Sequence, residues 1–429
     1  MQTVRRVAIL GGARIPFARV NSAYAEIGNQ DMLTAALSAL VNKFNLKNER
    51  LGEVAAGAVI KHSRDWNLAR ESTLGCGLHP ATPAYDLQRA CGTLLSAIAQ
   101  LGHRVALGEI DCAIGGGVDS ASDAPLALSK GLRKIFLKSF RAKSTAEKLK
   151  AWSAFRPAML APSPPSVGEP RTGMSMGQHC EEMAKEWKVS RQEQDVLALA
   201  SHKNAAAAWD GKFFDDLVFP FGGLKKDNNI RSDTSLEKLA QLKTAFDRSP
   251  AGTLTAGNSS PLTDGAACVL LGSEEWAKSR GVPVMAYLTF SESAAVDYVG
   301  MAGPKEGMLM APAYAVPRML DRAGLKLQDF DLYEIHEAFA AQVLCTLKAW
   351  ESPEYCREVL GLAAPLGSID RSRLNVKGGS VAVGHPFAAT GTRIVAALAK
   401  LLAGDSNAKR GLISVCAAGG MGVTAILEK

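Results

Sequence analysis

Short apolar runs of strand length alternate with longer stretches of helical periodicity along most of the chain. Leu33, Ala36, Leu37 and Leu40 fall on one helical face and predict a helix over Asp31–Lys43. Further helices are expected over Leu94–Leu101, Gly177–Trp187, Gln192–Trp209, Val316–Ala323, Ala338–Trp350 and Gly391–Leu402. Strands are expected at Val4–Leu10, Val54–Ile60, Asp111–Ile114, Gly265–Gly272, Val284–Phe290, Phe330–Ile335, Gly411–Cys416 and Val423–Glu428. Alternating strands and helices predict βαβ units, an α/β fold and a largely parallel sheet.

The chain runs through a similar series of elements twice. In the first pass an apolar strand leads to Cys91, a helix, and a strand that ends in Gly115–Gly117. In the second pass an apolar strand is expected over Gly378–Gly384 and leads to His385, a helix, and a strand followed by Gly419-Gly420. This repetition predicts two similar halves.

Between the halves the strand signals weaken. Residues 128–152 are basic and amphipathic, and Pro157–Pro170 is rich in proline. We expect an inserted, mostly helical region over 121–249, a first half formed by 1–120 and 250–277, and a second half over 278–429. The 128–152 stretch has two interpretations: a solvated helix face beside a cofactor channel, or a surface that contacts a membrane or a partner subunit.

Composition narrows the class of protein. The 429 residues are 47% hydrophobic and only 6% aromatic, which favours closely packed α/β layers over a β-sandwich. The eight cysteines form no CxxC pair and show no metal-like spacing, so we expect free thiols in a reducing compartment and no bound metal. No targeting segment and no apolar run of about 18 residues is found, which favours the cytoplasm. The net charge of +7 lacks the basic stripe with interleaved aromatics of a nucleic-acid binder, and an anionic, nucleotide-bearing ligand explains it equally well.

Two candidate reactive residues precede predicted helices. Cys91 stands before an apolar helix, where the helix dipole is expected to lower its pKa toward a thiolate; the alternative is an inert buried cysteine. His385 is followed by Pro386, which suits a first helical turn. It is a candidate base for Cys91, or else a helix-capping histidine.

Three further segments carry polar or glycine-rich chemistry. Cys416 leads into the Gly419-Gly420 loop, whose N–H groups suit an oxyanion, while the Lys-Ser/Thr of a phosphate loop is missing. His336-Glu337 suggests zinc, but HExxH fails because residue 340 is alanine, so a polar donor at a strand end is favoured. The small-residue loop Thr255–Gly265 can lie against an extended ligand, or is an ordinary turn-rich loop.

Taken in order, these segments resemble the thiolase family across essentially the whole chain. The resemblance rests on Gln-Arg-Ala before Cys91, the Thr-Ala-Gly-Asn loop from Thr255, His-Glu-Ala-Phe-Ala from His336, Gly-His-Pro around His385, and Cys-x-x-Gly-Gly-x-Gly from Cys416. It implies two βαβαβαββ halves forming a five-layered α-β-α-β-α core, with an inserted helical loop domain. It also implies ping-pong acyl transfer that cleaves 3-ketoacyl-CoA with CoA, without a permanently bound cofactor.

The resemblance assigns roles by position. Cys91 would be the nucleophile, His385 its base, Cys416 the second acid/base, and His336 the holder of a water. One oxyanion hole would use His385 with that water, and the other the backbone N–H groups of Cys91 and Ala418. Coenzyme A contacts would come from Arg231, Ala256, Ser260, Ala338 and Phe339.

Three departures from the family pattern refine this picture. His336 stands where the family commonly has asparagine. This His-Glu-Ala-Phe-Ala variant resembles the thiolase subunits of trifunctional fatty-acid oxidation complexes. Ala388 and Ala418 stand where many members have glycine, and a backbone donor survives that change only at negative φ. Ser175 stands where several short-chain biosynthetic members have histidine, which disfavours a dedicated acetoacetyl-CoA synthase.

The resemblance leads to a degradative 3-ketoacyl-CoA thiolase of β-oxidation. Its rivals are an acetyl-CoA C-acetyltransferase working in the condensation direction and a non-catalytic CoA-binding or scaffold subunit. A nicotinamide oxidoreductase predicts a GxGxxG fingerprint that the chain lacks. Expected partners are a second copy or three more copies of the chain, and a subunit with hydratase and dehydrogenase activities.

Overall fold

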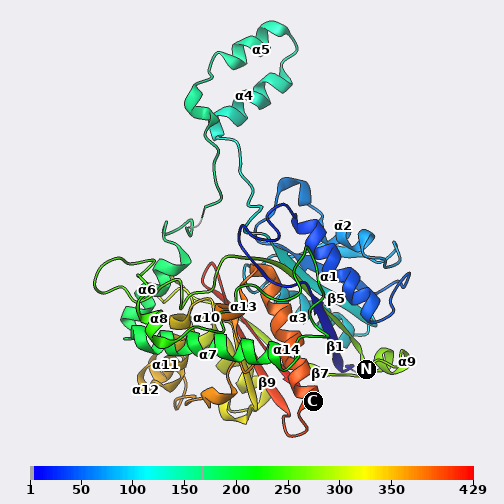
Figure 1. Ribbon diagram of the computed structural model, residues 1–429, viewed down its shortest axis with the longest axis vertical. Coiled ribbons are helices and arrows are strands. Elements are labelled where there is room, and N and C mark those ends of the chain that lie inside the picture. The colour runs from blue at the N-terminus through cyan, green and yellow to red at the C-terminus, as the bar shows by residue number, and fades with distance from the viewer. Residues whose placement is uncertain (1–3, 167) are drawn as a thin grey trace.

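A single mixed sheet runs through the computed structural model, which describes residues 4–166 and 168–429 (Figure 1). Its strand order is β4-β3-β5-β6-β1-β7-β10-β9-β8, and the short β2 pairs with β6. The strand bounds are β1 Val7–Arg14, β2 Ala18–Arg19, β3 Glu53–Gly57, β4 Ala84–Asp86, β5 Cys112–Asp119, β6 Thr263–Ser273, β7 Ala286–Ala295, β8 Leu332–Ile335, β9 Arg410–Ala417 and β10 Met421–Glu428.

The sheet contains the same arrangement twice, as the repeated sequence pattern predicts. In the first half β3 is parallel to β5, which is antiparallel to β6, which is antiparallel to β1. In the second half β8, β9, β10 and β7 repeat these relations in the same order. The halves join where β1 pairs with β7 through Ala8 and Ile9.

The expectation of a largely parallel sheet is wrong, because six of the nine strand pairings are antiparallel. A parallel neighbour requires a crossover, usually a helix, whereas a tight turn can only reverse the chain. Helices precede β5 and β9, but a turn of a few residues joins β9 to β10 and makes that pair antiparallel.

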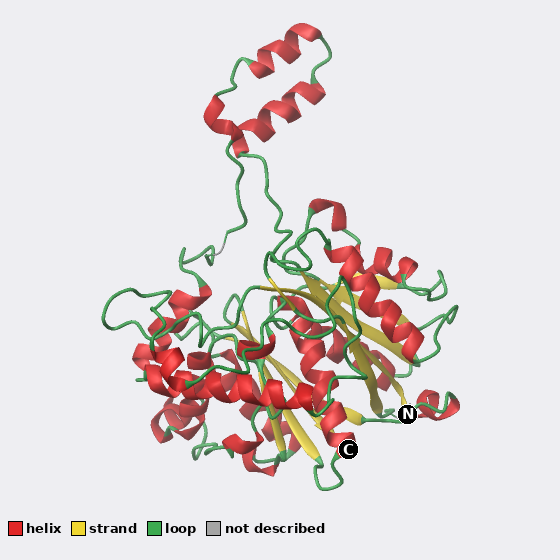
Figure 2. Cartoon of the chain, in the orientation of Figure 1, coloured by secondary structure: helices red, strands yellow, loops and turns green. Residues whose placement is uncertain are grey.

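Helices cover both faces of each half and make five layers (Figure 2). Helices α1 (Asn29–Lys43) and α2 (Leu68–Gly75) lie on the outer face of the first half. Helices α10 (Ala311–Ala323) and α11 (Ala340–Glu351) lie on the outer face of the second. Between the halves lie α3 (Thr93–Ala106) and α14 (Thr390–Gly404), so close that a Cβ on Gly391 would be 2.8 Å from the Leu95 nitrogen. The predicted α-β-α-β-α core is confirmed.

Glycines expected to end strands lie inside them instead. Strand β5 continues through Gly115–Gly117, which pair with Ala267–Val269 of β6. A Cβ on Gly117 would lie 2.0 Å from Leu94 Cδ2 and 2.6 Å from the Ala388 oxygen. These glycines therefore allow α3 and the residues after His385 to approach the strand.

Two further expectations are corrected near the second half of the site. Helix α10 begins at Ala311 and not at the expected Val316, so Pro317 lies inside the helix, and Pro312 occupies its first turn. The stretch before His385 is not a strand but the short helix α13 (Ser380–Val383).

The middle of the chain is mostly helical. It contains α4 (Lys130–Arg141), α5 (Thr145–Trp152), the 3-10 helix η2 (Pro157–Leu160), α6 (Met176–Glu186), α7 (Arg191–Asp210) and α8 (Leu236–Ala240). Helices α6 and α7 pack on α11, and α7 also packs on α13. Helices α4 and α5 pack on each other and form a hairpin that stands away from the body (Figure 1).

The remaining helices are short. They are η1 (Ser63–Asp65), α9 (Glu274–Ser279), η3 (Leu327–Asp329), α12 (Pro353–Glu358), η4 (Arg371–Arg373) and η5 (Phe387–Ala389). Among the described residues one segment, Phe387–Gly404, is long and apolar enough to cross a membrane, but 72% of it is buried inside the protein as η5 and the core helix α14.

Candidate active site

Cys91 lies on a sharp turn between β4 and α3. Ala90 adopts a left-handed φ of +45°, and Gly92 is the N-cap residue of α3. The Thr93 hydroxyl accepts from the Arg89 N–H at 2.8 Å and donates to the Ala90 oxygen at 2.6 Å. This turn fixes Cys91 at the start of the central helix α3, where its side chain is buried.

His385 faces Cys91 from the second half, and its Nε2 lies 3.1 Å from Cys91 Sγ. On the other side of the ring, Nδ1 lies 2.6 Å from Thr390 Oγ1. The Thr390 hydroxyl donates its one hydrogen to the Pro386 oxygen at 3.2 Å. Since that hydroxyl can then only accept from the ring, Nδ1 carries the proton and Nε2 presents a lone pair to the thiol.

The pKa values of this pair are moved apart, mainly by burial. Burial and the charge of Asp119 raise the pKa of Cys91 to about 12. Burial, with a smaller effect of Arg393, lowers the pKa of His385 to about 3. The expected lowering of the cysteine pKa by the helix terminus is wrong, because desolvation outweighs the nearby N–H groups. At neutral pH the pair is a thiol and a neutral imidazole.

His336 lies beside His385 at the end of β8, with ring centroids 4.2 Å apart. Its Nδ1 is 2.9 Å from Ser380 Oγ, whereas its buried Nε2 has no hydrogen-bond partner among the described residues. Burial, His385 and Arg393 together hold the pKa of His336 well below its usual range. A neutral histidine with one free nitrogen therefore borders the Cys91–His385 pair.

Cys416 and Ala418, at the end of β9, lie next to Cys91. Cys416 is fully buried, and burial together with Cys91 raises its pKa well above the usual thiol range. The backbone N–H groups of Ala418 and Cys91 both interact with Cys91 Sγ and lower its pKa. Neither Ala388 nor Ala418 is among the described residues with positive φ, so the alanines leave their backbone donors in place.

The three side chains at the centre could also hold a metal ion. The ligand atoms of Cys91, His336 and His385 all lie within 4.8 Å of one another. Cysteine and histidine are zinc ligands, but His385 Nε2 already accepts from the thiol, which is the geometry of a base beside a nucleophile.

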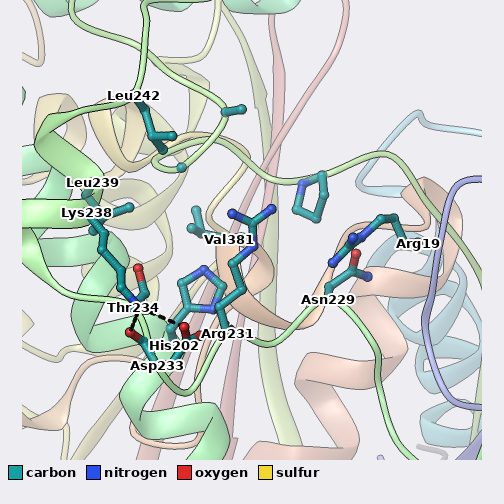
Figure 3. A pocket seen from close by; sticks show the side chains of 13 residues that line it. Arg19, His202, Asn229, Arg231, Asp233, Thr234, Lys238, Leu239, Leu242 and Val381 are labelled. Carbon is teal, nitrogen blue, oxygen red and sulfur yellow. Dashed lines mark hydrogen bonds and ion pairs between the residues drawn. The ribbon is translucent and has the colours of Figure 1, made fainter.

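A polar pocket lies between the inserted region and the first half, with Val381 of the second half also in its lining, and Figure 3 shows the residues that line it. Its cavity of about 160 Å³ is lined by Arg231 and Ala256, which were predicted to bind coenzyme A, and by Arg19 and Lys238, which were not. The guanidinium group of Arg231 points into the middle of the pocket. Three basic side chains around one cavity suit a ligand that carries phosphate groups.

The other predicted ligand-binding residues lie along a path from this pocket to the reactive pair. Ser259 and Phe339 form a β-bridge, and the Ser260 N–H donates to the Ala338 oxygen at 3.0 Å. The same segment continues to Leu262, which bridges His385. Val381 of α13 lines the pocket itself. The structure thus brings Cys91, His385, His336, Cys416 and Ala418 together at one centre, and it places Arg231 and Ala256 in a separate pocket.

Three residues of the site were not predicted from the sequence. Asp119 accepts from the Ala388 N–H at 2.7 Å, and burial raises its pKa to about 7. Ser380 and Thr390 each contact one of the two histidines. The available signal was that both hydroxyls lie within five residues of His385.

Comparisons with known proteins agree with this geometry. Residues 7–275 match the family described as "Thiolase, N-terminal domain", and residues 290–429 match "Thiolase, C-terminal domain". The "3-ketoacyl-CoA thiolase" proteins of Yersinia pestis (strain Pestoides F) and of Yersinia pseudotuberculosis serotype O:1b are each 41% identical over 429 residues, covering 99% of this chain and 97% of theirs. The crystal structure of the Bacillus anthracis acetyl-CoA acetyltransferase superposes with a TM-score of 0.81 at 29% identity, and the match covers 100% of both chains. The chain belongs to the thiolase family.

Proposed function

We propose that this chain is a 3-ketoacyl-CoA thiolase that cleaves 3-ketoacyl-CoA with CoA, as the names of its curated relatives suggest. The observation that carries the proposal is the 3.1 Å contact between Cys91 Sγ and the unprotonated Nε2 of His385. A thiol beside a neutral, oriented imidazole is the arrangement of a nucleophile with its general base.

In the first half-reaction His385 takes the proton of Cys91 as Sγ attacks the 3-keto carbon. The bond between C2 and C3 then breaks, and its electron pair goes to acetyl-CoA as an enolate. Cys416 gives its proton to C2, which releases acetyl-CoA and leaves the shortened acyl chain as a thioester on Cys91. The burial of Cys416 supports this role, because a protonated thiol is the acid that this step requires.

In the second half-reaction the Cys416 thiolate takes the proton of an incoming CoA thiol. The CoA sulfur attacks the thioester carbon, Cys91 leaves, and it recovers its proton from His385. The products are an acyl-CoA shorter by two carbons and the enzyme in its starting protonation state.

Two oxyanion holes would serve two different oxygens. The backbone N–H groups of Cys91 and Ala418 lie at Cys91 Sγ, so they suit the oxygen of the carbon bonded to that sulfur. His385, once protonated, and His336 with a bound water would hold the thioester oxygen of the enolate. Support for the second hole is the unpartnered Nε2 of His336 beside His385.

Coenzyme A would lie in the polar pocket with its pantetheine arm pointing toward His385. Arg231, Lys238 and Arg19 would face its phosphate groups, since they are the basic side chains of the pocket. Ala256, Ser260, Ala338 and Phe339 would line the pantetheine path. The enzyme then holds its substrates and needs no permanently bound cofactor.

We propose the degradative direction, with acetyl-CoA C-acetyltransferase activity as the alternative. The loss of 3-ketoacyl-CoA absorbance on adding CoA, followed from four to sixteen carbons, separates the two. Cleavage of medium and long chains supports the degradative role, whereas activity confined to acetoacetyl-CoA would contradict it.

Two variants test the assigned roles. Cys91→Ser should lose all thiolysis; a variant that kept it would support a non-catalytic assignment of this site. Cys416→Ala should lose carbon–carbon cleavage and also slow the exchange of labelled CoA into acyl-CoA, because both reactions pass a proton through Cys416, while Cys91 stays open to alkylation by iodoacetamide. Cys356→Ala, which removes a buried thiol outside the site, is the control.

We also propose that the enzyme works as a homodimer or homotetramer with a subunit that carries hydratase and dehydrogenase activities. The cytoplasm suits it, because its eight cysteines are all free and buried and require no oxidising compartment.

The hairpin of α4 and α5 would contact a membrane with acidic lipids. Its position away from the body disfavours the alternative of a helix face beside the cofactor channel. Residues 128–152 contain eight basic residues and one acidic residue, and Phe140 is 86% exposed. Exposed apolar side chains among lysines and arginines are typical of surfaces that lie on anionic bilayers.

A further inference from the structure

A serine hydroxyl lies behind the histidine that the proposed mechanism uses as a donor. Ser380 Oγ is 2.9 Å from His336 Nδ1 and 3.3 Å from Arg393 Nη2. All three side chains are buried. The free Nε2 of the neutral His336 ring either donates or accepts a hydrogen bond. Which it does depends on whether the single ring proton is on Nε2 or on Nδ1.

The single hydrogen of the Ser380 hydroxyl determines the direction of the hydrogen bond between Ser380 and His336, because Arg393 cannot accept it. A guanidinium group has donors and no acceptor, so Ser380 Oγ must accept from Arg393. The serine has one hydrogen, and His336 Nδ1 is the acceptor within reach among its described contacts. With Nδ1 accepting, the proton of the neutral imidazole is on Nε2, the nitrogen that has no partner.

The two histidines of the site therefore hold opposite tautomers. Thr390 accepts from His385 Nδ1 and leaves Nε2 free to take a proton. Ser380 donates to His336 Nδ1 and leaves Nε2 able to donate one. Thr390 thus makes His385 a base, and Ser380 makes His336 a hydrogen-bond donor. The centroids of the two histidine rings are 4.2 Å apart.

The backbone that carries Ser380 is tied down by Glu337, the neighbour of His336. Its carboxylate accepts from the Val381 N–H at 3.1 Å, from Asn375 Nδ2 at 2.6 Å and from the Ser201 hydroxyl at 2.7 Å. A Cβ on Gly379 would lie 2.1 Å from the Glu337 carboxyl carbon, so only glycine fits there. The start of α13 is thus fixed against the residue next to His336, which keeps Ser380 in register with the ring.

We propose that Ser380 is a positioning residue that holds His336 in the Nε2–H tautomer, so that this nitrogen donates a hydrogen bond to the substrate oxygen or to the water that binds it. The proposal rests on the proposed function for the identity of that oxygen. It does not depend on that function for the tautomer itself.

The first test measures the tautomer directly. Long-range ¹H–¹⁵N correlation spectra of the full chain with ¹⁵N-labelled histidine report which ring nitrogen is protonated, and His336→Asn identifies the signal. We expect Nδ1 to be the unprotonated nitrogen in the wild type and a mixture of tautomers in Ser380→Ala. A wild-type His336 with its proton on Nδ1 would overturn the proposal, whatever the reaction of the enzyme.

The second test is a double-mutant cycle on thiolysis. Removing a whole oxyanion donor costs about 10²–10³ in kcat, so Ser380→Ala, which only loosens one, should lower kcat on the order of tenfold with little change in KM. In a His336→Asn background the side-chain amide donates without any tautomer, and the same substitution should then cost less than about twofold. Equal losses in both backgrounds would show a purely structural role and reject the proposal.

Two controls complete the design. Ser380→Thr keeps the hydroxyl and should recover most of the loss, while Ser72→Ala removes a buried hydroxyl of α2, remote from the site, and should change nothing. A wild-type chain without any thiolysis would contradict the proposed function alone, because the tautomer measurement would still stand.

Discussion

The reactive pair of Cys91 and His385 is held neutral by its surroundings. Burial raises the pKa of the thiol to about 12 and lowers the pKa of the imidazole to about 3, so neither group titrates between pH 5 and 9. An ion pair formed at rest would require the opposite shifts. The proton therefore has to move during the attack and not before it.

Alkylation of Cys91 by iodoacetamide tests this state. Because only the thiolate reacts, and its fraction grows with pH below the pKa, the rate should rise about tenfold for each pH unit from 6 to 9 without a plateau. Mass spectrometry of the labelled peptide measures the rate, and Cys91→Ser should leave that peptide unlabelled. A rate that stayed level across this range would indicate a resting thiolate–imidazolium pair.

Residue types and order were predictable from the sequence, but the protonation states were not. Cys91, His385, Cys416 and His336 stand in motifs that the chain itself displays. The pKa shifts depend on burial, which arises only when α3 and α14 are enclosed between the two halves of the sheet. The hydroxyl contact of His336 is with Ser380, 44 positions away; the position of Ser380 near His385 places it at the site but does not indicate which histidine it contacts.

At the scale of elements, the hairpin of α4 and α5 differs from the other helices because it packs on itself and on η2 and stands away from the sheet and its covering helices. Leu132 and Ile135 are buried within it, whereas Phe140 and Leu149 are exposed. Its helical periodicity was visible in the sequence, but its position was not, because periodicity gives a face and not a neighbour.

Charge reversal of the hairpin tests its proposed contact with acidic lipids. Lys130, Lys134 and Lys138 are all exposed, and a basic residue near an anionic surface contributes about 1 kcal/mol. The triple Lys→Glu variant should bind vesicles containing phosphatidylserine at least about 100-fold more weakly in sedimentation, while thiolysis of short acyl-CoA is unchanged. Lys47→Glu with Lys278→Glu, which reverses two exposed charges on the body, is the control for charge reversal away from the hairpin.

Unchanged vesicle binding by the triple variant would reject the membrane contact. If the variant instead lost only its association with a hydratase and dehydrogenase subunit, the hairpin would be a protein-docking surface. Raising the salt concentration should weaken the wild-type binding, because exposed charges are screened.

The elements that sequence periodicity misassigned share one cause. The interior glycines of β5, the short helix α13 and the antiparallel order of the sheet all depend on which segments approach one another. Residue 117 lies within the β5 ladder and is a glycine because Leu94 and Ala388 leave no room for a side chain there. In the sequence alone the same glycines indicate the end of a strand.

At the scale of the whole molecule, a buried ion pair joins the inserted region to the first half. Arg14 of β1 contacts Asp227 through two hydrogen bonds of 2.5 and 2.7 Å. The same carboxylate accepts from the Phe17 N–H at 2.7 Å and from Trp209 Nε1 at 3.1 Å. Asp227 therefore connects β1, α7 and the segment that leads to Arg231 in the polar pocket.

Asp227→Ala should be among the most destabilising single substitutions in this protein. It would leave the guanidinium of Arg14 buried and unpaired, and losing one partner of such a pair costs about 3–5 kcal/mol. The midpoint of urea unfolding should fall accordingly, and the KM for CoA should rise because Arg231 loses its support. Asp233→Ala breaks the exposed ion pair with Lys238 and should leave the unfolding midpoint in place. If both variants unfolded at the wild-type midpoint, the inserted region would be held to the first half by apolar packing, and the network around Asp227 would be dispensable for stability.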